Sequence, residues 1–235
     1  QSVGKMKLVI VIPAFNEEEA IASVIEGVPR DALDQVKVLV IDDGSTDATV
    51  PKAERAGADR VVSFDRNRGL AAAFRRGLEE ALETGADVIV NIDADGQYDA
   101  REIPKLIEPI VKGMADIVLG SRFKGWIEEM PIGKRIGNII ATKATSVASG
   151  LPISDSQTGF RAFSREAALR LDVLSDYTYV QETIIQAAYE RLRIVEIPCT
   201  FRKRKGKSRL ITNIFSYAWR AGLTVLRTYT DYKPL

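Results

Sequence analysis

Short apolar runs recur about every 25–30 residues through the first half of the chain, with amphipathic stretches between them. Runs of this length that are rich in Val, Ile and Leu are typical of buried strands. Strands that alternate with helices predict βαβ units, and hence an α/β fold with a mostly parallel sheet covered by helices on both faces. The expected strands span residues 8–12, 36–41, 60–64, 88–92 and 117–119, and the expected helices span residues 16–28, 47–56, 70–83 and 103–111.

A short polar cluster follows each of these runs, and most of the clusters contain a glycine. Because right-handed crossovers bring the carboxyl ends of parallel strands to one edge of a sheet, we expect the clusters to meet there. That edge is where open α/β sheets bind their ligands. The clusters are residues 13–17, 42–45, 66–69, 93–97 and 121–122.

The fourth run ends in Asp93-Ala94-Asp95-Gly96, which puts two carboxylates at the expected edge. Carboxylate oxygens suit Mg²⁺ or Mn²⁺, and such ions usually complete their coordination with substrate phosphates. The alternative is an ordinary capped turn. The other polar clusters favour a metal site over that turn, with Gln97 as a third ligand or an acceptor-side contact.

The composition excludes several classes of site. The 235 residues contain no His, which rules out imidazole metal ligands and Ser-His-Asp triads. The single Cys199 cannot form an internal disulfide, and no apolar run is long enough to span a bilayer. A net charge of +1 gives no general attraction to nucleic acid, so any basic function has to be local.

The alternating pattern changes after Arg122. The chain later carries a strongly basic run, residues 202–209, and ends in an amphipathic stretch over 210–229 that has the spacing of a helix. Between them we expect a loop over 123–131, helices over 133–149, 164–171 and 180–191, a turn leading into a strand over 155–163, and a strand over 194–201.

Several motifs occur in the order that resembles family 2 glycosyltransferases with the GT-A fold. The downstream part is similar to the polyprenyl-phosphate glycosyltransferases, which include dolichyl-phosphate mannose synthase and its glucosyl and N-acetylhexosaminyl relatives. The likeness spans about residues 7–232. It implies a GT-A catalytic domain over 5–209, followed by an amphipathic membrane-interface helix and tail over 210–235, after which members often continue into transmembrane helices. The motifs are Pro13-Ala14-Phe15-Asn16-Glu17, Asp42-Asp43-Gly44-Ser45-Thr46-Asp47, Asn67-Arg68-Gly69, Asp93-Ala94-Asp95-Gly96-Gln97, Gly120-Ser121-Arg122 and Thr158-Gly159-Phe160-Arg161, with Arg135, Glu182 and Gly206-Lys207-Ser208-Arg209-Leu210 downstream.

On the donor side, the resemblance implies that Asp93, Asp95 and Gln97 hold Mg²⁺ or Mn²⁺ against the diphosphate of a nucleotide sugar. An acid after the second strand would read the base or ribose, so that Asp42 binds while Asp47 caps the next helix. The other implied nucleotide contacts are Pro13, Ala14, Asn16, Glu17, Asp43, Gly44, Arg68, Gly69 and Ala94. Three of these have a plainer alternative, because Asn16 and Glu17 also suit a helix start and Arg68 a solvated loop.

On the acceptor side, Arg122 and Arg135 would grip the acceptor phosphate, although Arg135 could also be a surface residue of its helix. Glu182 would be a general base for a hydroxyl acceptor, or would only orient its neighbours if the acceptor is a lipid phosphate. The basic run would close over the diphosphate, attract anionic lipid headgroups or remain solvated. The helix over 210–229 would lie in the membrane plane, cover the core or form a dimer. The implied contacts in the basic run are Arg202, Lys203, Lys205 and Ser208.

The sequence therefore predicts a metal-dependent, inverting transfer of a hexose to polyprenyl or dolichyl phosphate at the cytoplasmic face of a membrane. GDP-mannose, UDP-glucose and UDP-N-acetylglucosamine all fit as donors, and Asp95, Arg122, Arg135 and Glu182 are the expected catalytic residues. Two alternatives remain: transfer to a soluble or glycan acceptor with Glu182 as general base, and nucleotide-sugar binding without catalysis. Nucleic acid is not an expected partner, and oligomerisation stays open.

Overall fold

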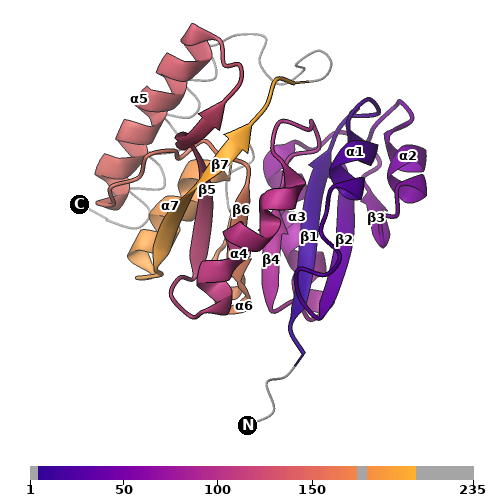
Figure 1. Cartoon of the computed structure of the whole chain (residues 1–235), viewed down its shortest axis with the longest axis horizontal. Helices are drawn as coiled ribbons and strands as arrows, with labels where there is room; N and C mark the ends of the chain where they lie inside the picture. Colours follow the sequence, from indigo (N-terminus) through magenta and orange to yellow (C-terminus); the bar gives the residue numbers. More distant parts are fainter. Residues whose placement is uncertain (1–4, 174–178, 205–235) are drawn as a thin grey trace.

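A computed structural model describes residues 5–173 and 179–204 of the chain. Within this part, seven strands form one sheet in the order β3-β2-β1-β4-β6-β5-β7, with the N-terminal and C-terminal halves of the chain side by side (Figure 1). The strands are β1 Lys7–Ala14, β2 Gln35–Asp42, β3 Arg60–Ser63, β4 Val88–Asn91, β5 Ile117–Ile127, β6 Arg161–Ser164 and β7 Ile194–Phe201. The helices are α1 Ile21–Glu26, α2 Thr49–Arg55, α3 Leu70–Glu83, α4 Ile103–Val111, α5 Ile132–Ser149, α6 Arg165–Arg170 and α7 Val180–Tyr189, with a short 3₁₀ turn at Ala100–Glu102.

The sheet is mostly parallel, as the alternating pattern predicts. Strands β1 to β4 are parallel to one another, and β5 is parallel to β7. Strand β6 is the exception, because it is inserted antiparallel between β4 and β5. Since β6 is antiparallel to both neighbours, β4 and β5 still point the same way, and their carboxyl ends share one edge with those of β1, β2 and β3.

The central strands β1 and β4 are buried on both faces, which explains why they are continuously apolar in sequence. On one face, Leu8, Ile10 and Ile12 of β1 pack in a core with residues of α1 and α4. On the other face, Val9 and Val11 of the same strand pack in a second core with residues of α3, α6 and α7. The helices therefore cover both faces of the sheet.

Two sequence predictions about local structure are wrong. The expected loop over 123–131 begins with strand, because β5 continues to Ile127 and pairs again with β7 at Trp126 and Ile127, after an irregularity in register. The expected helix over 16–28 is much shorter, and Asn16 does not cap it. Asn16 instead has a left-handed backbone (φ 53°), and its Oδ1 accepts a hydrogen bond of 2.8 Å from the amide of Thr46.

Among the residues that the structure describes, no helix is both long enough and apolar enough to cross a membrane. The amphipathic helix predicted over 210–229 lies outside the described residues.

Candidate active site

Four of the five predicted clusters line one cavity of about 160 Å³ at the carboxyl edge of the sheet. The predicted nucleotide contacts that line it are Pro13, Ala14, Glu17, Asp43, Gly69, Asp93 and Ala94, together with the predicted metal ligand Asp95. The other lining residues are Phe15, Asn67, Leu70, Ala73 and Arg204, which the sequence did not single out. Asn16, Asp42, Gly44 and Arg68 belong to the same loops but do not line this cavity.

Direct contacts fasten these loops to one another. The amide of Asn16 donates to Ser45 Oγ at 2.9 Å, which joins the loop after β1 to the loop after β2. Gly44 has φ +74°, and a Cβ on it would lie only 2.6 Å from the backbone carbon of Arg66. A side chain at position 44 would therefore push the loop after β2 away from the loop after β3. The cavity wall is built by backbone packing as well as by side chains.

The two acids after β2 have different positions. Asp43 lines the cavity and accepts hydrogen bonds from the amides of Arg68 (2.6 Å) and Gly69 (2.9 Å), just before α3. Burial raises the pKa of Asp43, and the two amide hydrogen bonds oppose that rise. Asp42 turns back onto its own loop, where Oδ1 accepts from the amide of Ser45 at 3.1 Å. The acid at the cavity wall is therefore Asp43, where the sequence favoured Asp42.

The side chain of Arg68 lies outside the cavity lining. Its guanidinium stacks 4.9 Å above the ring of Phe64 and forms an ion pair of 2.7 Å with Asp65. Half of the side chain is exposed (52 %). The position of Arg68 agrees with the alternative interpretation of the sequence, in which Arg68 is a solvated loop residue.

Asp93 lies against Gly159, and the closeness of the two leaves no room for a side chain at position 159. A Cβ there would sit 2.6 Å from Asp93 Cγ. Among the described residues, none donates a hydrogen bond to the Asp93 carboxylate. Burial and the neighbouring charge of Asp95 raise the pKa of Asp93 to about 7. Asp93 therefore lacks the donors that would stabilise its ionised form.

The Asp93–Asp95 pair fits a hard divalent cation. A bound cation would provide the direct positive contact that the Asp93 carboxylate lacks among the described residues. Within the described part of the chain, no group of three or more acidic, Cys or His side chains is arranged to hold a metal. An ion at this pair would thus need further oxygen ligands, which a donor diphosphate and water can supply.

Gln97 makes contacts that hold the backbone of the basic run. Its Nε2 donates to the carbonyl of Arg202 at 3.1 Å, and its own carbonyl accepts from the amide of Arg202 at 2.7 Å. Its amide donates to Asp95 Oδ1 at 3.0 Å. The prediction that Gln97 is a metal ligand stays a prediction.

Arg122 is buried within β5, where it forms a two-pronged ion pair with Asp155. The Nε–Oδ2 and Nη2–Oδ1 distances are both 2.7 Å, and the two side chains are 4 % and 0 % exposed. Asp155 thus already engages two of the guanidinium nitrogens that were predicted to grip an acceptor phosphate. That role of Arg122 stays a prediction.

On α5, Lys134 rather than Arg135 faces the acidic pair. Arg135 is exposed, whereas Lys134 is partly buried, with Nζ 5.6 Å from the centre of the Phe201 ring. Burial and the nearby Arg122 lower the pKa of Lys134, while Asp95 and Asp93 oppose that change. Helical spacing in the sequence could have identified Lys134. Lys134, Asn138, Thr142 and Thr145 fall on one face of the helix, and the last three are buried.

Glu182 lies in the first turn of α7 and is buried (3 % exposed). It is not among the residues that line the cavity at Asp93. Its predicted role as a general base stays a prediction.

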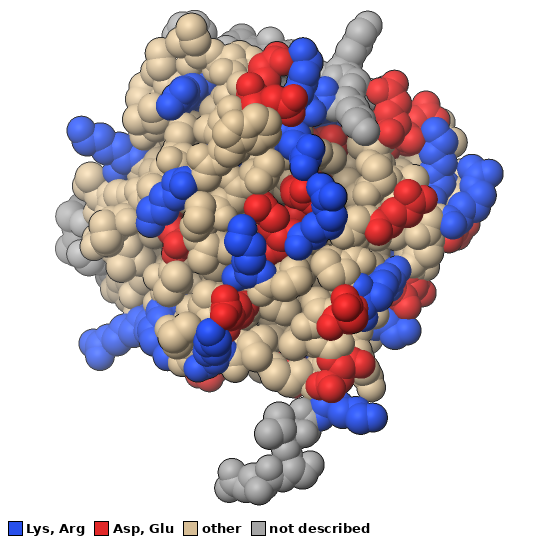
Figure 2. Space-filling model, in the orientation of Figure 1, with Lys and Arg blue, Asp and Glu red and all other residues tan. Residues whose placement is uncertain are grey.

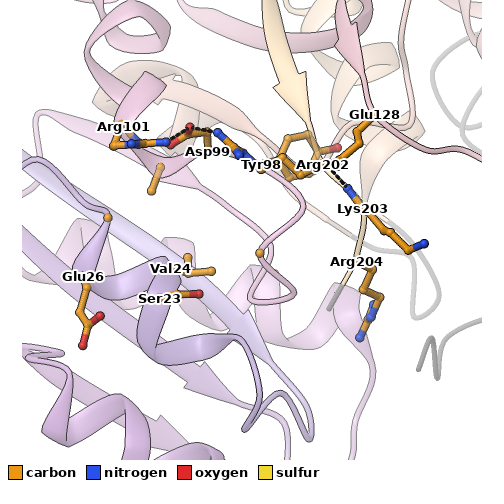
Figure 3. Close-up of a pocket in the computed structure, with 13 residues that line it drawn as sticks. Ser23, Val24, Glu26, Tyr98, Asp99, Arg101, Glu128, Arg202, Lys203 and Arg204 are labelled. Atoms are coloured by element: carbon orange, nitrogen blue, oxygen red, sulfur yellow. Dashed lines mark hydrogen bonds and ion pairs between the residues drawn. The ribbon is translucent and has the colours of Figure 1, made fainter. Parts of the chain in front are cut away.

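The described part of the basic run, which we call the basic strap, consists of Arg202, Lys203 and Arg204. It borders a second cavity of about 670 Å³, between α1 and the segment that follows β4 (Figure 3). Arg202 pairs with Asp99 at 3.0 Å, and Lys203 pairs with Glu129 at 2.8 Å. The predicted contacts Lys205 and Ser208 lie outside the described residues.

Arg204 lines both cavities and is the strap residue that enters the candidate site. Its Nη1 lies 3.1 Å from Asp95 Oδ2, and its Nη2 forms an ion pair with Glu17. Sequence reasoning noted the basic run but did not distinguish Arg204 within it, because nothing local separates one cation from the next.

Comparison with known proteins places these features in context. The family model described as "Glycosyl transferase family 2" matches residues 9–171. The UDP-N-acetylglucosamine–dolichyl-phosphate N-acetylglucosaminyltransferase of Methanococcus voltae is 33 % identical over 213 residues, covering 80 % of this chain and 83 % of that one. The undecaprenyl-phosphate mannosyltransferase of Micrococcus luteus is 31 % identical over 224 residues, covering 91 % of each chain.

The solved structures that match show the fold. Glucosyl-3-phosphoglycerate synthase from Mycobacterium tuberculosis, crystallised with Mn²⁺, UDP and glucosyl-3-phosphoglycerate, superposes with a TM-score of 0.74 at 24 % sequence identity. The match covers 97 % of this chain and 80 % of that one.

Proposed function

Because this chain belongs to glycosyl transferase family 2, we propose that it transfers a hexose from a nucleoside-diphosphate sugar to a polyprenyl or dolichyl phosphate. The observation that carries the proposal is the Asp93–Asp95 pair in a cavity where four strand-end loops meet. Relatives named for transfer to lipid phosphates match most of the chain, which supports this acceptor class.

Different residues of the cavity would bind different parts of the donor. Asp43, Gly69 and the loop after β1 would hold the nucleoside, and Asp93 and Asp95 would hold Mg²⁺ or Mn²⁺. When bound, the ion neutralises the charge that grows on the departing nucleoside diphosphate. An oxygen of the acceptor phosphate forms the new bond to C1 as the bond from C1 to the diphosphate breaks, with inversion. The electron pair of the broken bond leaves with the diphosphate.

The acceptor needs no general base, because a phosphate monoester is already ionised at neutral pH. Cations near the acid pair would instead position it. Lys134 faces Asp93 and Asp95 from α5, and Arg122 lies close enough to influence both Asp93 and Lys134. Burial of Glu182 gives no support to the alternative in which it deprotonates a hydroxyl acceptor.

The outer face of α5 supports a lipid acceptor at a membrane surface, and we propose that this surface is the cytoplasmic one. Ile132, Ile136, Ile139, Ile140 and Val147 are each at least half exposed on this helix. The helix contains Lys134, Arg135 and Lys143 but no acidic residue. A helix with an exposed apolar face and no acidic residue suits the surface of an anionic membrane. Over much of the face drawn in Figure 2, acidic and basic side chains are interspersed.

The decisive experiment offers the protein several donors and one short polyprenyl phosphate. GDP-mannose, UDP-glucose and UDP-N-acetylglucosamine are each incubated with the protein and Mn²⁺ or Mg²⁺, and products are identified by mass spectrometry. We expect one donor to give a glycosylated lipid phosphate and Asp95→Asn to abolish it. Transfer only to free sugars, or undiminished activity in D95N, would contradict the proposal; donor binding without any product would favour a non-catalytic binding protein.

A further inference from the structure

Four carboxylates line the candidate donor cavity, and Arg204 is the only cation among the described residues that line it. The acids are Glu17, Asp43, Asp93 and Asp95. Arg204 bridges two of them, with Nη1 at 3.1 Å from Asp95 Oδ2 and Nη2 against Glu17. All three side chains are well shielded, at 15 % exposure for Arg204 and Glu17 and 12 % for Asp95. Arg204 therefore offsets part of the negative charge of the acidic cluster from within.

The backbone of the basic strap is fixed just before Arg204. Arg202 exchanges two hydrogen bonds with Gln97, which lies two residues after Asp95. Its side chain turns to Asp99, and the amide of Lys203 donates to Glu128 at 2.9 Å. Figure 3 shows Arg202 directed toward Asp99 and Arg101, and Arg204 directed away from them. These contacts anchor Arg202 and Lys203, and the side chain of Arg204 can turn away if its contact with Asp95 breaks.

The contact of Arg204 is also incomplete. Its Nε is buried and has no hydrogen-bond partner within the described part of the chain. A buried donor without a partner costs free energy, so this guanidinium is held less firmly than a fully bonded one. By comparison, Arg122 engages Asp155 through both Nε and Nη2.

We propose that Arg204 is a built-in competitor of the divalent cation at Asp95. This inference rests on the proposed function, because it assumes that Asp95 binds a metal ion. A cation bound at Asp95 and the guanidinium draw on the same carboxylate charge and repel each other at short range. The ion therefore has to displace Arg204 from Asp95, and metal binding without nucleotide is weakened by that exchange.

The exchange also couples the metal to the nucleotide. An ion that arrives alone leaves the displaced guanidinium with Glu17 as its one partner among the described residues. An ion that arrives with a diphosphate brings new oxygens that a guanidinium can bind in a two-pronged manner. Arg204 thus makes the site favour the metal–nucleotide complex over the bare ion.

The test measures binding of Mn²⁺ alone by the electron paramagnetic resonance signal of the free ion. Arg204→Gln removes the competitor, and we expect it to bind Mn²⁺ about tenfold more tightly than the wild type. Arg101→Gln is the matched control. It removes a guanidinium that pairs with Asp99 beside the second cavity and is 70 % exposed, so its affinity should match the wild type. In the double variant D95N/R204Q, the gain should disappear.

The possible results distinguish a wrong competitor role for Arg204 from a wrong metal site. If R204Q binds Mn²⁺ no more tightly than the wild type, while wild-type binding still requires Asp95, the competitor role is wrong and the metal site stands. If neither protein binds Mn²⁺, either alone or with UDP or GDP, the metal site itself is wrong, and the proposed function falls with it. Circular dichroism melts of every variant exclude unfolding as the cause of a lost signal.

Discussion

The buried ion pair between Arg122 and Asp155 sets the position of residues around β5. Asp155 also accepts hydrogen bonds from the amides of Arg122 (3.0 Å) and Gln157 (3.1 Å), so one carboxylate organises two segments. Removing one partner of a buried pair leaves the other charge without compensation, which is more costly than never forming the pair.

Asp155→Asn should therefore lower the free energy of unfolding by about 3–5 kcal/mol, as measured by urea denaturation. Glu108→Gln is the control, because Glu108 is about half exposed and pairs with Lys112 at the surface. We expect no measurable change there. A loss of less than about 1 kcal/mol in D155N would show that Arg122 does not depend on this partner.

A second prediction at the residue scale concerns Gly159. A Cβ at this position would sit 2.6 Å from Asp93 Cγ, so Gly159→Ala must displace the carboxylate or the strand-entry loop. We expect transferase activity to fall at least tenfold and stability to fall by about 1–3 kcal/mol. Gly137→Ala should lower neither quantity, because nothing lies within 4 Å of the added methyl group. Wild-type activity in G159A would mean that Asp93 is not held where the structure has it.

At the scale of elements, Asp59 joins three parts of the N-terminal half just before β3. It accepts hydrogen bonds from Lys37 Nζ and the amide of Val38, both at 2.8 Å, and it pairs with Arg30. Partial burial alone would raise its pKa, but these bonds outweigh burial and hold the pKa at about 2. The folded-state pKa is thus below the usual Asp pKa of 3.8, so the stabilisation is full above that pH and is lost as the pH falls toward 2.

Asp59→Asn should cost about 2 kcal/mol of unfolding free energy at pH 7, and about 1 kcal/mol less than that at pH 3. Urea denaturation at the two pH values measures the difference. Asp65→Asn serves as a control, since Asp65 pairs with Arg68 in an exposed loop. A cost in D59N that does not change with pH would refute the assignment of the stabilisation to the ionised carboxylate.

The two faces of α5 differ in burial and polarity. Asn138, Thr142 and Thr145 face the protein, whereas the outer face presents exposed isoleucines. Ile136→Glu with Ile140→Glu should reduce the fraction of protein that floats with anionic liposomes about tenfold, because burial of apolar surface and attraction to headgroups both weaken. The double variant M114E/L169E adds equal charge at exposed apolar sites on other elements and should float like the wild type. Equal flotation of both variants would exclude α5 as the lipid-binding face.

At the scale of the whole molecule, the sheet brings the proposed donor and acceptor segments to one edge. The donor loops follow β1, β2, β3 and β4, and the proposed acceptor cations come from β5 and α5. The insertion of β6 between β4 and β5 places Gly159, just before it, against Asp93. Occupying the cavity should therefore stabilise the molecule as a unit.

UDP or GDP with Mn²⁺, at about one hundred times the dissociation constant, should add about 2.7 kcal/mol of stability. For a chain of this size that corresponds to a rise in Tm of about 5–10 °C, measured by differential scanning fluorimetry. The rise should vanish in EDTA and in D95N. If neither nucleotide changes the Tm, the cavity does not bind a nucleoside diphosphate.

Much of the architecture follows from local sequence patterns. The spacing of apolar runs determines the alternating strands and helices, and the crossover rule then places the strand ends together. The wrong predictions have long-range causes. Strand β5 extends to Ile127 because β7 is beside it, and Asn16 leaves its helix because Thr46 offers a partner from another loop. Neither partner can be inferred from the neighbours of these residues in sequence.

The sequence by itself determined a mostly parallel sheet with Asp93 and Asp95 at its carboxyl edge, because hydrophobic period and motif spacing are local properties. Only the tertiary structure decided that Asp43 lines the cavity, that Lys134 faces the acidic pair, and that Arg204 meets Asp95 from 109 residues away. The strength of an ionic contact depends on distance and burial in space. Both are set by how the whole chain packs, so similar cations in one basic run acquire different partners.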